Sequence, residues 1–291
     1  MKQKHYTIKS FERDFPTDDA CLEWLKNNRW PDGIFCEKCQ KVTKHHKVTN
    51  RSAYACDFCG NHVYPMAGTI LEHSSTKLSL WFHAMYLMAS TRCGISAKQL
   101  QRETGVTYKT AWRMFKQIRL MLGDNGDLEG SSVEVDETYI GGKRRGKRGR
   151  GAEGKSIVVG AVERKGRVRA EKVPDVKATT LVPFIERTIA PNSMVYTDDL
   201  PSYNKLGQKG YDHKSVPHSQ KIYVIEDIHT NSIEGFWSLV KRGINGVYHS
   251  VGSDYLQSYV NEYSFRYNRR NSGGTMFEAF LGRLVASGQD E

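Results

Sequence analysis

Residues 133–142, VEVDETYIGG, determine how the rest of this chain is interpreted. Apolar and polar residues alternate as far as a pair of glycines, which is the pattern of a half-buried strand that ends in a turn. Because the side chains of a strand point alternately to its two faces, Asp136 shares a face with Glu134, and Glu137 lies on the other. We take Asp136 as the candidate functional acid, although spacing alone does not exclude Glu134.

A second acid follows another strand-like segment. In residues 194–203, MVYTDDLPSY, Asp198 and Asp199 follow an apolar run that predicts a buried strand. Adjacent strand residues point in different directions, so only one of these acids faces the site. We expect it to be Asp198, which is nearer to the apolar run, and keep Asp199 as the alternative.

The third acid lies in a helical pattern. In residues 229–246, HTNSIEGFWSLVKRGING, Lys241 follows Glu234 by seven residues, which is about two helical turns, so both lie on one face. The spacing Asn231-x-x-Glu234 also fits a capping box, which would explain both residues without chemistry. For Lys241 the alternative interpretation is an ordinary lysine on the helix surface.

These acids predict a metal site. Carboxylates brought together from separate elements raise one another's pKa and are stabilised by a cation. Hard carboxylate oxygens suit Mg²⁺. The chain carries a formal net charge of +11, which favours polyanionic partners. A metal held by acids in so basic a chain indicates phosphodiester chemistry, with Lys241 placed to hold a phosphate or a DNA end.

Composition sets the outer limits of the fold. The 291 residues, of which 38% are apolar, are enough for about two domains with ordinary cores. No run of about 18 apolar residues occurs, and the first residues lack the apolar region of a secretory signal. We therefore expect no membrane partner and a cytoplasmic location.

A dense run of positive charge follows the first strand. Charges this close repel one another and stay solvated, which predicts a loop or arm between two strands. We expect this arm to follow a DNA phosphate backbone, although a solubilising loop would have the same composition. Its six cations are Lys143, Arg144, Arg145, Lys147, Arg148 and Arg150.

Four of the six cysteines form two Cys-x-x-Cys motifs, joined by sixteen residues. Short knuckles of this kind aim two sulfurs at one point, as tetrahedral Zn²⁺ requires. A pair of redox dithiols is the alternative, but it would more often use one motif than two. We predict a structural Zn²⁺ in a ribbon over residues 31–66. Its ligands would be Cys36, Cys39, Cys56 and Cys59.

Residues 75–123 have a helical pattern that is interrupted by a glycine turn. The pattern resembles a helix-turn-helix, whose second helix would direct Tyr108, Lys109 and Arg113 toward a DNA major groove. Gln101 stands where many such motifs have a small residue. A purely structural helical hairpin therefore remains an alternative.

The order of the remaining elements predicts the fold class. Residues 1–30 form a helical segment before the ribbon, and residues 123–132 form a linker rich in glycine, aspartate and serine. After this linker come three strand-like runs, then helix and strand in alternation, and finally two helices. This order predicts a mixed α/β sheet covered by helices over residues 131–285.

These motifs together resemble the DDE transposases of bacterial insertion sequences. In particular, they resemble the zinc-ribbon-bearing, ISXO-like group called the insertion sequence 1595 family. Thirty-five residues separate Asp198 from Glu234, a spacing common in such enzymes, and Lys241 matches a basic residue placed two turns after the third acid. The run HTNSIEGFWSLVKRGINGVYH resembles the family's C-terminal signature, and NEYSFRYNRR contains its E-x3-R-x2-R pattern. The resemblance spans nearly the whole chain.

The resemblance implies a fold and a mechanism. DDE transposases have an RNase H-like catalytic domain in which three acids, here Asp136, Asp198 and Glu234, hold two Mg²⁺ (or Mn²⁺) ions. Water would hydrolyse a strand at each transposon end, and the freed 3′-OH would attack target DNA without a covalent enzyme intermediate. Lys241 would position the DNA. Some relatives have asparagine in place of the third acid, so Asn231 is a secondary candidate.

The resemblance also implies partners. The ribbon and the helix-turn-helix would recognise the terminal inverted repeats, and pairing two ends requires at least a dimer. Tyr263 and Tyr267 would either stack on DNA or pack in the core, whereas Trp237 is expected in the core. His249 is a secondary candidate for the site. A basic helix face would be formed by Arg266, Arg269 and Arg270.

Three other functional classes share some of these features. The main alternative is a catalytically silent DNA-binding regulator derived from a transposase, against which the presence of all three acids argues. A tyrosine recombinase typically needs a His-x-x-Arg box, and none of the ten histidines has arginine three residues later. An RNase H-like nuclease or resolvase shares the acids but rarely carries two DNA-reading modules in front of them.

Overall fold

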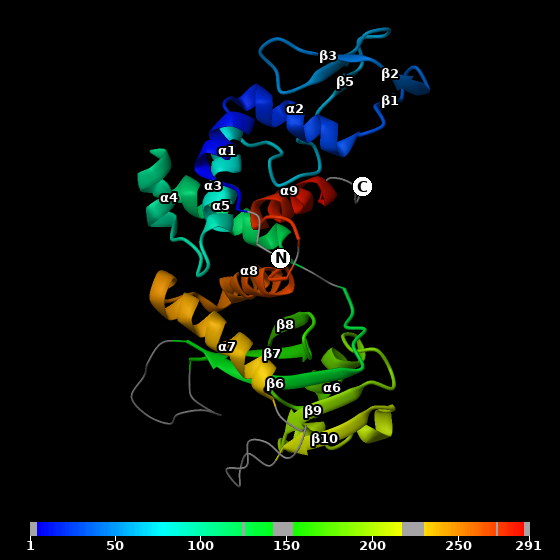
Figure 1. Ribbon diagram of the computed structural model, residues 1–291, viewed down its shortest axis with the longest axis vertical. Helices are drawn as coiled ribbons and strands as arrows, with labels where there is room; N and C mark the ends of the chain where they lie inside the picture. Colours follow the sequence, from blue (N-terminus) through cyan, green and yellow to red (C-terminus); the bar gives the residue numbers. More distant parts are fainter. Residues whose placement is uncertain (1–4, 124–125, 142–153, 217–229, 272, 288–291) are drawn as a thin grey trace. The chain divides into compact units, whose positions relative to one another are not determined.

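The computed structural model describes residues 5–123, 126–141, 154–216, 230–271 and 273–287 (Figure 1). The chain forms two compact units, one made of Met1–Met121 and Ser272–Glu291 and the other of Leu122–Asn271. The basic run at residues 143–150 lies outside the described residues. Among the helices that are described, none is long and apolar enough to cross a membrane.

The first unit combines a helical bundle with two small sheets. Thr17 caps α2 by accepting a hydrogen bond from the Ala20 amide, as expected for a helix that starts after a threonine. Gly105 ends α4 in the left-handed region (φ +71°), which makes the glycine turn of the helix-turn-helix pattern. The helices are α1 (Ile8–Asp14), α2 (Asp18–Arg29), α3 (Leu78–Ser90), α4 (Ala97–Thr104), α5 (Tyr108–Met121) and α9 (Met276–Ala286).

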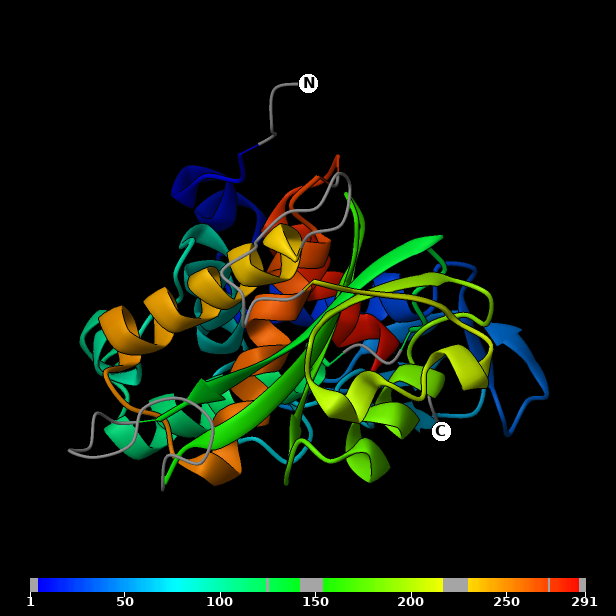
Figure 2. The same cartoon turned by 90° about the horizontal axis from the view of Figure 1, so that it is seen from below.

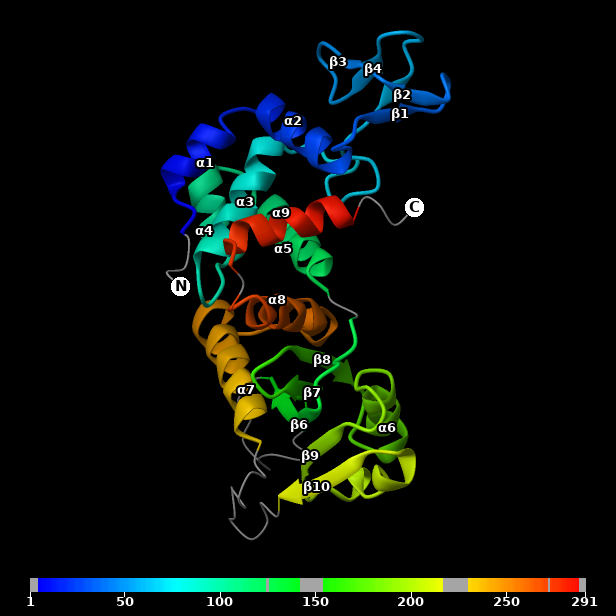
Figure 3. The same cartoon turned by 45° about the vertical axis from the view of Figure 1, so that its right-hand side comes forward.

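Helix α9 belongs to this first unit although it is the last helix of the chain (Figures 1 and 3). The prediction that the C-terminal domain extends to residue 285 is therefore wrong at that end. Phe277 and Phe280 are almost fully buried, and the Phe277 ring contacts the rings of Phe11 and Tyr86. An amphipathic helix must bury its apolar face somewhere, and this one does so against α3 and α2.

The ribbon contains two antiparallel sheets. One pairs β1 (Ile34–Cys36) with β2 (Lys41–Thr43), and the other has the order β3-β4-β5. The strands of the second sheet are β3 (His45–Lys47), β4 (Tyr54–Cys56) and β5 (His62–Val63).

The second unit contains a five-stranded mixed sheet with the order β10-β9-β6-β7-β8. Strands β6, β7 and β8 pair antiparallel, whereas β9 is parallel to β6 and β10 is parallel to β9. This is the predicted mixed α/β, RNase H-like arrangement, and the fold class is confirmed. The strands are β6 (Ser132–Ile140), β7 (Ser156–Glu163), β8 (Val168–Val173), β9 (Met194–Asp198) and β10 (Asp212–Val216).

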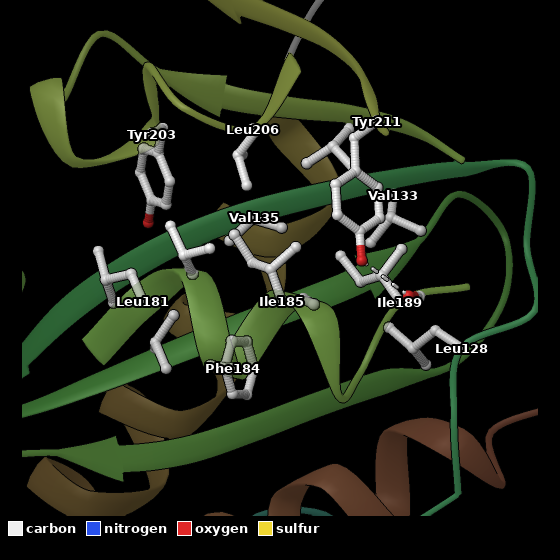
Figure 4. Packing of buried hydrophobic residues seen from close by; sticks show 14 of the residues in the cluster. Leu128, Val133, Val135, Leu181, Phe184, Ile185, Ile189, Tyr203, Leu206 and Tyr211 are labelled. Carbon is white, nitrogen blue, oxygen red and sulfur yellow. Dashed lines mark hydrogen bonds between the residues drawn. The ribbon is translucent and has the colours of Figure 1, made fainter. Parts of the chain in front are cut away.

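Helices cover both faces of this sheet (Figure 2). Helix α6 (Ala178–Glu186) packs on one face over a core that includes Val133 and Val135, both fully buried (Figure 4). Helices α7 (Asn231–Gly243) and α8 (Leu256–Asn268) pack on the other face, over Val158 and Val162. Because Asp136 alternates with the valines of β6, its side chain is directed to the face that α7 covers.

Candidate functional site

Asp136 sits in the middle of β6, opposite Gly160 of β7. The Trp237 indole Nε1 donates a hydrogen bond to Asp136 Oδ2 over 3.1 Å, and this tryptophan is 3% exposed. Trp237 is therefore a core residue, as expected, and also a direct partner of the candidate acid. Gly160 makes room for it, since a Cβ at that position would lie 2.7 Å from two indole carbons.

We expect Gly160→Ala to destabilise the second unit by about 1–3 kcal/mol, because the added methyl group forces the Trp237 indole away from the sheet. Urea unfolding of the purified protein measures this change. The matched control is Gly207→Ala, where a Cβ meets nothing within 4 Å. Equal effects of the two substitutions would contradict the packing argument.

Burial and, after it, the carboxylates of Glu137 and Asp198 together raise the pKa of Asp136 to about 7. Glu137 lies on the opposite face of β6, where the Tyr203 hydroxyl donates to its Oε2 over 3.0 Å. Burial and the nearby Glu137 carboxylate hold the pKa of Tyr203 well above its usual value. Asp136 therefore lies in a cluster of negative charge that favours a cation.

Asp198 is the last residue of β9, which runs parallel to β6. The pairing aligns Glu134 with Tyr196, and Asp136 and Asp198 each follow by two residues on the same face. Asp198 is partly buried and its Oδ1 accepts a hydrogen bond from the Leu200 amide over 3.0 Å, whereas Asp199 is exposed. The geometry thus brings Asp198 to the side of Asp136.

Glu234 lies in the first turn of α7, and its side chain is exposed. Thr230, rather than Asn231, is the N-cap residue, and its hydroxyl donates to Glu234 Oε1 over 3.3 Å. The capping box with Asn231 is therefore not formed, and this alternative is wrong. The Glu234 carboxylate is not engaged in capping its own helix.

Lys241 follows two turns later and is electrostatically coupled to Asp136. Desolvation lowers the pKa of Lys241 despite its exposed side chain, and the nearby Lys155 lowers it further, while the Asp136 carboxylate acts in the opposite direction. Lys155 was not predicted as a site residue, because nothing in the sequence around it indicates where its side chain lies.

The cap of α7 is provided by Glu134, a fully buried residue of β6. Its Oε2 accepts hydrogen bonds from the amides of Ser232 (2.8 Å) and Ile233 (3.1 Å). Its Oε1 accepts from the Ser232 hydroxyl and from Arg164 Nε, both over 3.1 Å. Glu134, the acid that spacing did not exclude, is thus held by the start of a helix almost a hundred residues further along the chain.

The three acids do not gather as closely as the cysteines do. Within the described ranges, the one group of potential ligands that lie within 4.8 Å of one another is the four-cysteine set. Asp136 and Asp198 are within electrostatic range, and Glu234 is on the helix that covers them. A buried carboxylate whose pKa is raised by neighbouring carboxylates has the donor chemistry for a divalent cation.

The four cysteine sulfurs form a compact group in the ribbon. Cys36 Sγ lies 3.5 Å from Cys59 Sγ, and Cys39 Sγ lies 3.9 Å from Cys56 Sγ. Sulfurs in a tetrahedral Zn²⁺ site are roughly 3.8 Å apart, given a Zn–S distance of about 2.3 Å. The Thr43 hydroxyl lies 3.2 Å from Cys56 Sγ and lowers the pKa of that thiol to about 6. These residues fit a structural zinc site.

The predicted DNA-binding residues of the first unit lie on α5, where Tyr108, Lys109 and Arg113 are all exposed. Arg113 Nη2 donates to Thr76 Oγ1 over 3.1 Å, so part of its guanidinium is engaged within the unit. The Lys98 ammonium lies 4.8 Å from the centre of the Tyr108 ring.

The predicted basic face of α8 and its end is only partly formed. Arg266 is 7% exposed and donates two hydrogen bonds to the fully buried Glu262, one turn earlier. Arg266 is thus a structural residue, and the prediction that it faces DNA is wrong. Arg269 is exposed, and the Arg270 guanidinium stacks 3.8 Å from the centre of the Tyr267 ring.

The remaining predictions in this region divide between core and surface. Tyr263 is fully buried in the core under α7, so it packs rather than stacks on DNA. A Cβ on Gly243 would overlap the Tyr263 side chain, which shows how closely α7 and α8 approach there. His249 is exposed after the π-helical turn Ile244–Tyr248, with φ +59°. The six cations of the basic arm lie outside the described residues.

Comparison with known protein families identifies two matches. Residues 127–268 match the ISXO2-like transposase domain, and residues 16–62 match the transposase zinc-ribbon domain. A protein of Halobacterium salinarum described as an uncharacterized protein in transposable element ISH50 is 28% identical in an alignment of 275 residues, gaps included, that covers 87% of this chain and 92% of that protein. An uncharacterized transposase-like protein of Haemophilus influenzae is 30% identical over 96 residues, which are 33% of this chain and 76% of that protein.

Similar solved structures include transposition and integration complexes. A chain of the simian T-cell lymphotropic virus intasome in complex with PP2A regulatory subunit B56 gamma has a TM-score of 0.32 and 15% identity, covering 67% of this chain and 71% of that one. A chain of a pre-cleavage Mos1 transpososome has a TM-score of 0.25 and 12% identity, and the match covers 67% of this chain and 75% of that one. These scores are low, so the family assignment depends on the sequence matches. This chain belongs to the ISXO2-like family of insertion-sequence transposases, with a transposase zinc ribbon preceding the transposase domain.

Proposed function

We propose that this transposase binds the terminal inverted repeats of its element, hydrolyses a DNA strand at each end and joins the freed 3′-OH to target DNA. The observation that carries this proposal is the position of Asp136. Its carboxylate is partly buried and lies near Asp198 on the sheet face that carries α7, the helix of Glu234 and Lys241, and its pKa is raised to about 7. An acid that resists ionisation until a cation arrives is suited to binding a divalent metal.

Asp136, Asp198 and Glu234 would hold two Mg²⁺ or Mn²⁺ ions, which supply charge stabilisation at the attacking and leaving oxygens of an in-line displacement. The chain's own residues orient these ligands. Trp237 fixes Asp136 through its indole N–H, and the Leu200 amide fixes Asp198. Lys241 places a positive charge on the same helix face as Glu234, where it would hold a DNA phosphate. Asp199, Asn231 and His249 remain secondary candidates.

DNA would be held by several surfaces. We propose that the ribbon and the helix-turn-helix, with Tyr108, Lys109 and Arg113, read the transposon ends. The basic arm at residues 143–150 and the pair Arg269 and Arg270 would contact phosphates. Pairing two ends would require at least a dimer.

The test is strand cleavage and joining on labelled transposon-end DNA with Mg²⁺. We expect Glu234→Gln to lose cleavage while it keeps end binding, and Asp199→Asn to retain both. Cleavage by Glu234→Gln at the wild-type rate would refute its assignment as the third ligand. End binding by the wild type without any cleavage would instead identify a catalytically silent DNA-binding regulator.

Lys241→Ala is expected to weaken binding of end DNA, because the lysine would neutralise a phosphate. Each lost phosphate contact reduces the slope of log affinity against log salt concentration by about 0.9 on duplex DNA. Fluorescence anisotropy over a series of salt concentrations measures that slope. The control is Lys209→Ala, since this lysine pairs with Glu186 over 3.1 Å. A slope that Lys241→Ala leaves unchanged would exclude a phosphate contact.

A further inference from the structure

We propose that the buried Glu134 and the partly buried Arg164 form a positioning pair that holds the three acid-bearing elements in register for metal binding. The inference rests on the proposed function of Asp136, Asp198 and Glu234. It assigns a role to two residues that contact neither the metal nor the DNA in that proposal.

The pair contacts all three elements. Glu134 belongs to β6, and its carboxylate accepts hydrogen bonds from the Ser232 and Ile233 amides at the start of α7. Arg164 follows β7, donates to Glu134 Oε1 over 3.1 Å, and lies 4.0 Å from the centre of the Tyr196 ring of β9. One carboxylate and one guanidinium therefore connect β6, β9 and α7.

On each of the three elements, a residue that the pair contacts or contains precedes the acid by two positions. Asp136 comes two residues after Glu134, and Asp198 comes two residues after Tyr196. Glu234 comes two residues after Ser232. On a strand, residues two positions apart lie on the same face, about 7 Å from each other. Fixing Glu134 or Tyr196 therefore also orients the acid that follows it by two positions. In the helix, the anchored amides belong to the same first turn as Glu234.

The energetics favour a fixed arrangement over a loose one. The first amides of a helix have no partner within the helix, and the helix dipole favours a negative charge at this end. Glu134 is fully buried, so removing its carboxylate leaves two helix amides without that acceptor, and the partly exposed Arg164 guanidinium loses its partner on β6. Helix α7 is thus fixed to β6 at the end that carries Glu234, and not merely packed against it.

The experiment compares Glu134→Ala with Glu134→Gln. Glutamine keeps an oxygen that accepts from the two amides, whereas alanine removes it. We expect alanine to raise the Mg²⁺ concentration for half-maximal cleavage about 10–100-fold, as for other residues that orient metal ligands, and glutamine to rescue most of this loss. Hydrogen exchange of the Ser232 and Ile233 amides should become faster in the alanine variant.

The control is Glu262→Ala, which removes the carboxylate of another carboxylate–guanidinium pair of the same unit. It should lower thermal stability without changing the Mg²⁺ requirement. If Glu134→Ala does not fold, the same two measurements are made on Arg164→Lys, which removes the hydrogen bond from Arg164 Nε to Glu134 and should also raise the Mg²⁺ requirement.

The outcomes distinguish failure of the positioning role from failure of the proposed function. A Mg²⁺ requirement within twofold of the wild type in the alanine variant would overturn the positioning role, whatever happens to the amides. If the wild type cleaves no DNA, the proposed function fails instead. The positioning role is then tested by amide exchange and by Mg²⁺ binding measured calorimetrically.

Discussion

Asp136→Asn is expected to abolish Mg²⁺-dependent strand cleavage and, in the absence of metal, to make the protein more stable at pH 8. The loss of cleavage should reach about a thousandfold or more, which corresponds to about 4 kcal/mol of transition-state stabilisation. Asparagine keeps the shape of the side chain and an oxygen that accepts from Trp237, but it cannot carry the negative charge that a divalent ion requires.

The gain in stability follows from the raised pKa of Asp136, which is about 7 in the folded protein against a usual value of 3.8. Between these two values the folded protein binds more protons than the unfolded chain, so this group's contribution to stability falls as the pH rises. At pH 8 the folded wild type holds a desolvated charge that the asparagine variant lacks. Near pH 4 the difference should disappear.

Thermal unfolding from pH 4 to pH 8, with and without Mg²⁺, measures both effects. Mg²⁺ should stabilise the wild type at pH 8 and leave the variant unchanged, because binding to the folded state alone raises stability. The control is Asp212→Asn, the same chemical change at an exposed residue of the second unit. A variant that cleaves DNA, or one less stable than the wild type in metal-free buffer at pH 8, would contradict the prediction.

Loss of zinc is expected to unfold the ribbon and abolish specific end binding. Structural Zn²⁺ contributes about 10–16 kcal/mol in isolated finger peptides at neutral pH, far more than the short strands β1 to β5 could replace. Cys36→Ser removes one of the four ligands, and we expect it to bind no zinc and to lose its affinity for transposon ends.

Zinc content by mass spectrometry and end binding by gel shift test this prediction. The control is Cys93→Ser, the same change at an exposed cysteine outside the four-cysteine group. It should retain one zinc per chain. End binding that survives both Cys36→Ser and chelation would show that the ribbon does not read DNA.

The sequence predicted those features that depend on local pattern. The alternation in VEVDETYI placed Val133 and Val135 toward one core and Asp136 toward the opposite face, as the sheet has them. Two Cys-x-x-Cys knuckles sufficed for the ribbon because each one fixes its own geometry. The order of strands and helices gave the fold class, since few sheets accommodate three antiparallel strands followed by two parallel ones.

The sequence alone does not predict features that depend on residues distant in the chain. Nothing in the sequence near Glu134 indicates that its carboxylate accepts hydrogen bonds from the Ser232 and Ile233 amides, because this contact results from the packing of α7 on the sheet. Arg266 was misjudged for a related reason. Its spacing from Glu262 fits a helix surface, yet both side chains are buried and pair with each other. A pattern reports which residues share a face, but not what covers that face.

The position of α9 has a consequence for how the protein is made. Its residues leave the ribosome only after the entire transposase domain, and yet they complete the core around Phe11 and Tyr86. The first unit therefore has to wait, with apolar surface exposed, until the transposase domain has been synthesised. The position of α9 also determines which fragments of the protein can fold. A DNA-binding fragment cut at residue 121 lacks part of its own core, and it should fold properly only when residues 273–287 are supplied with it.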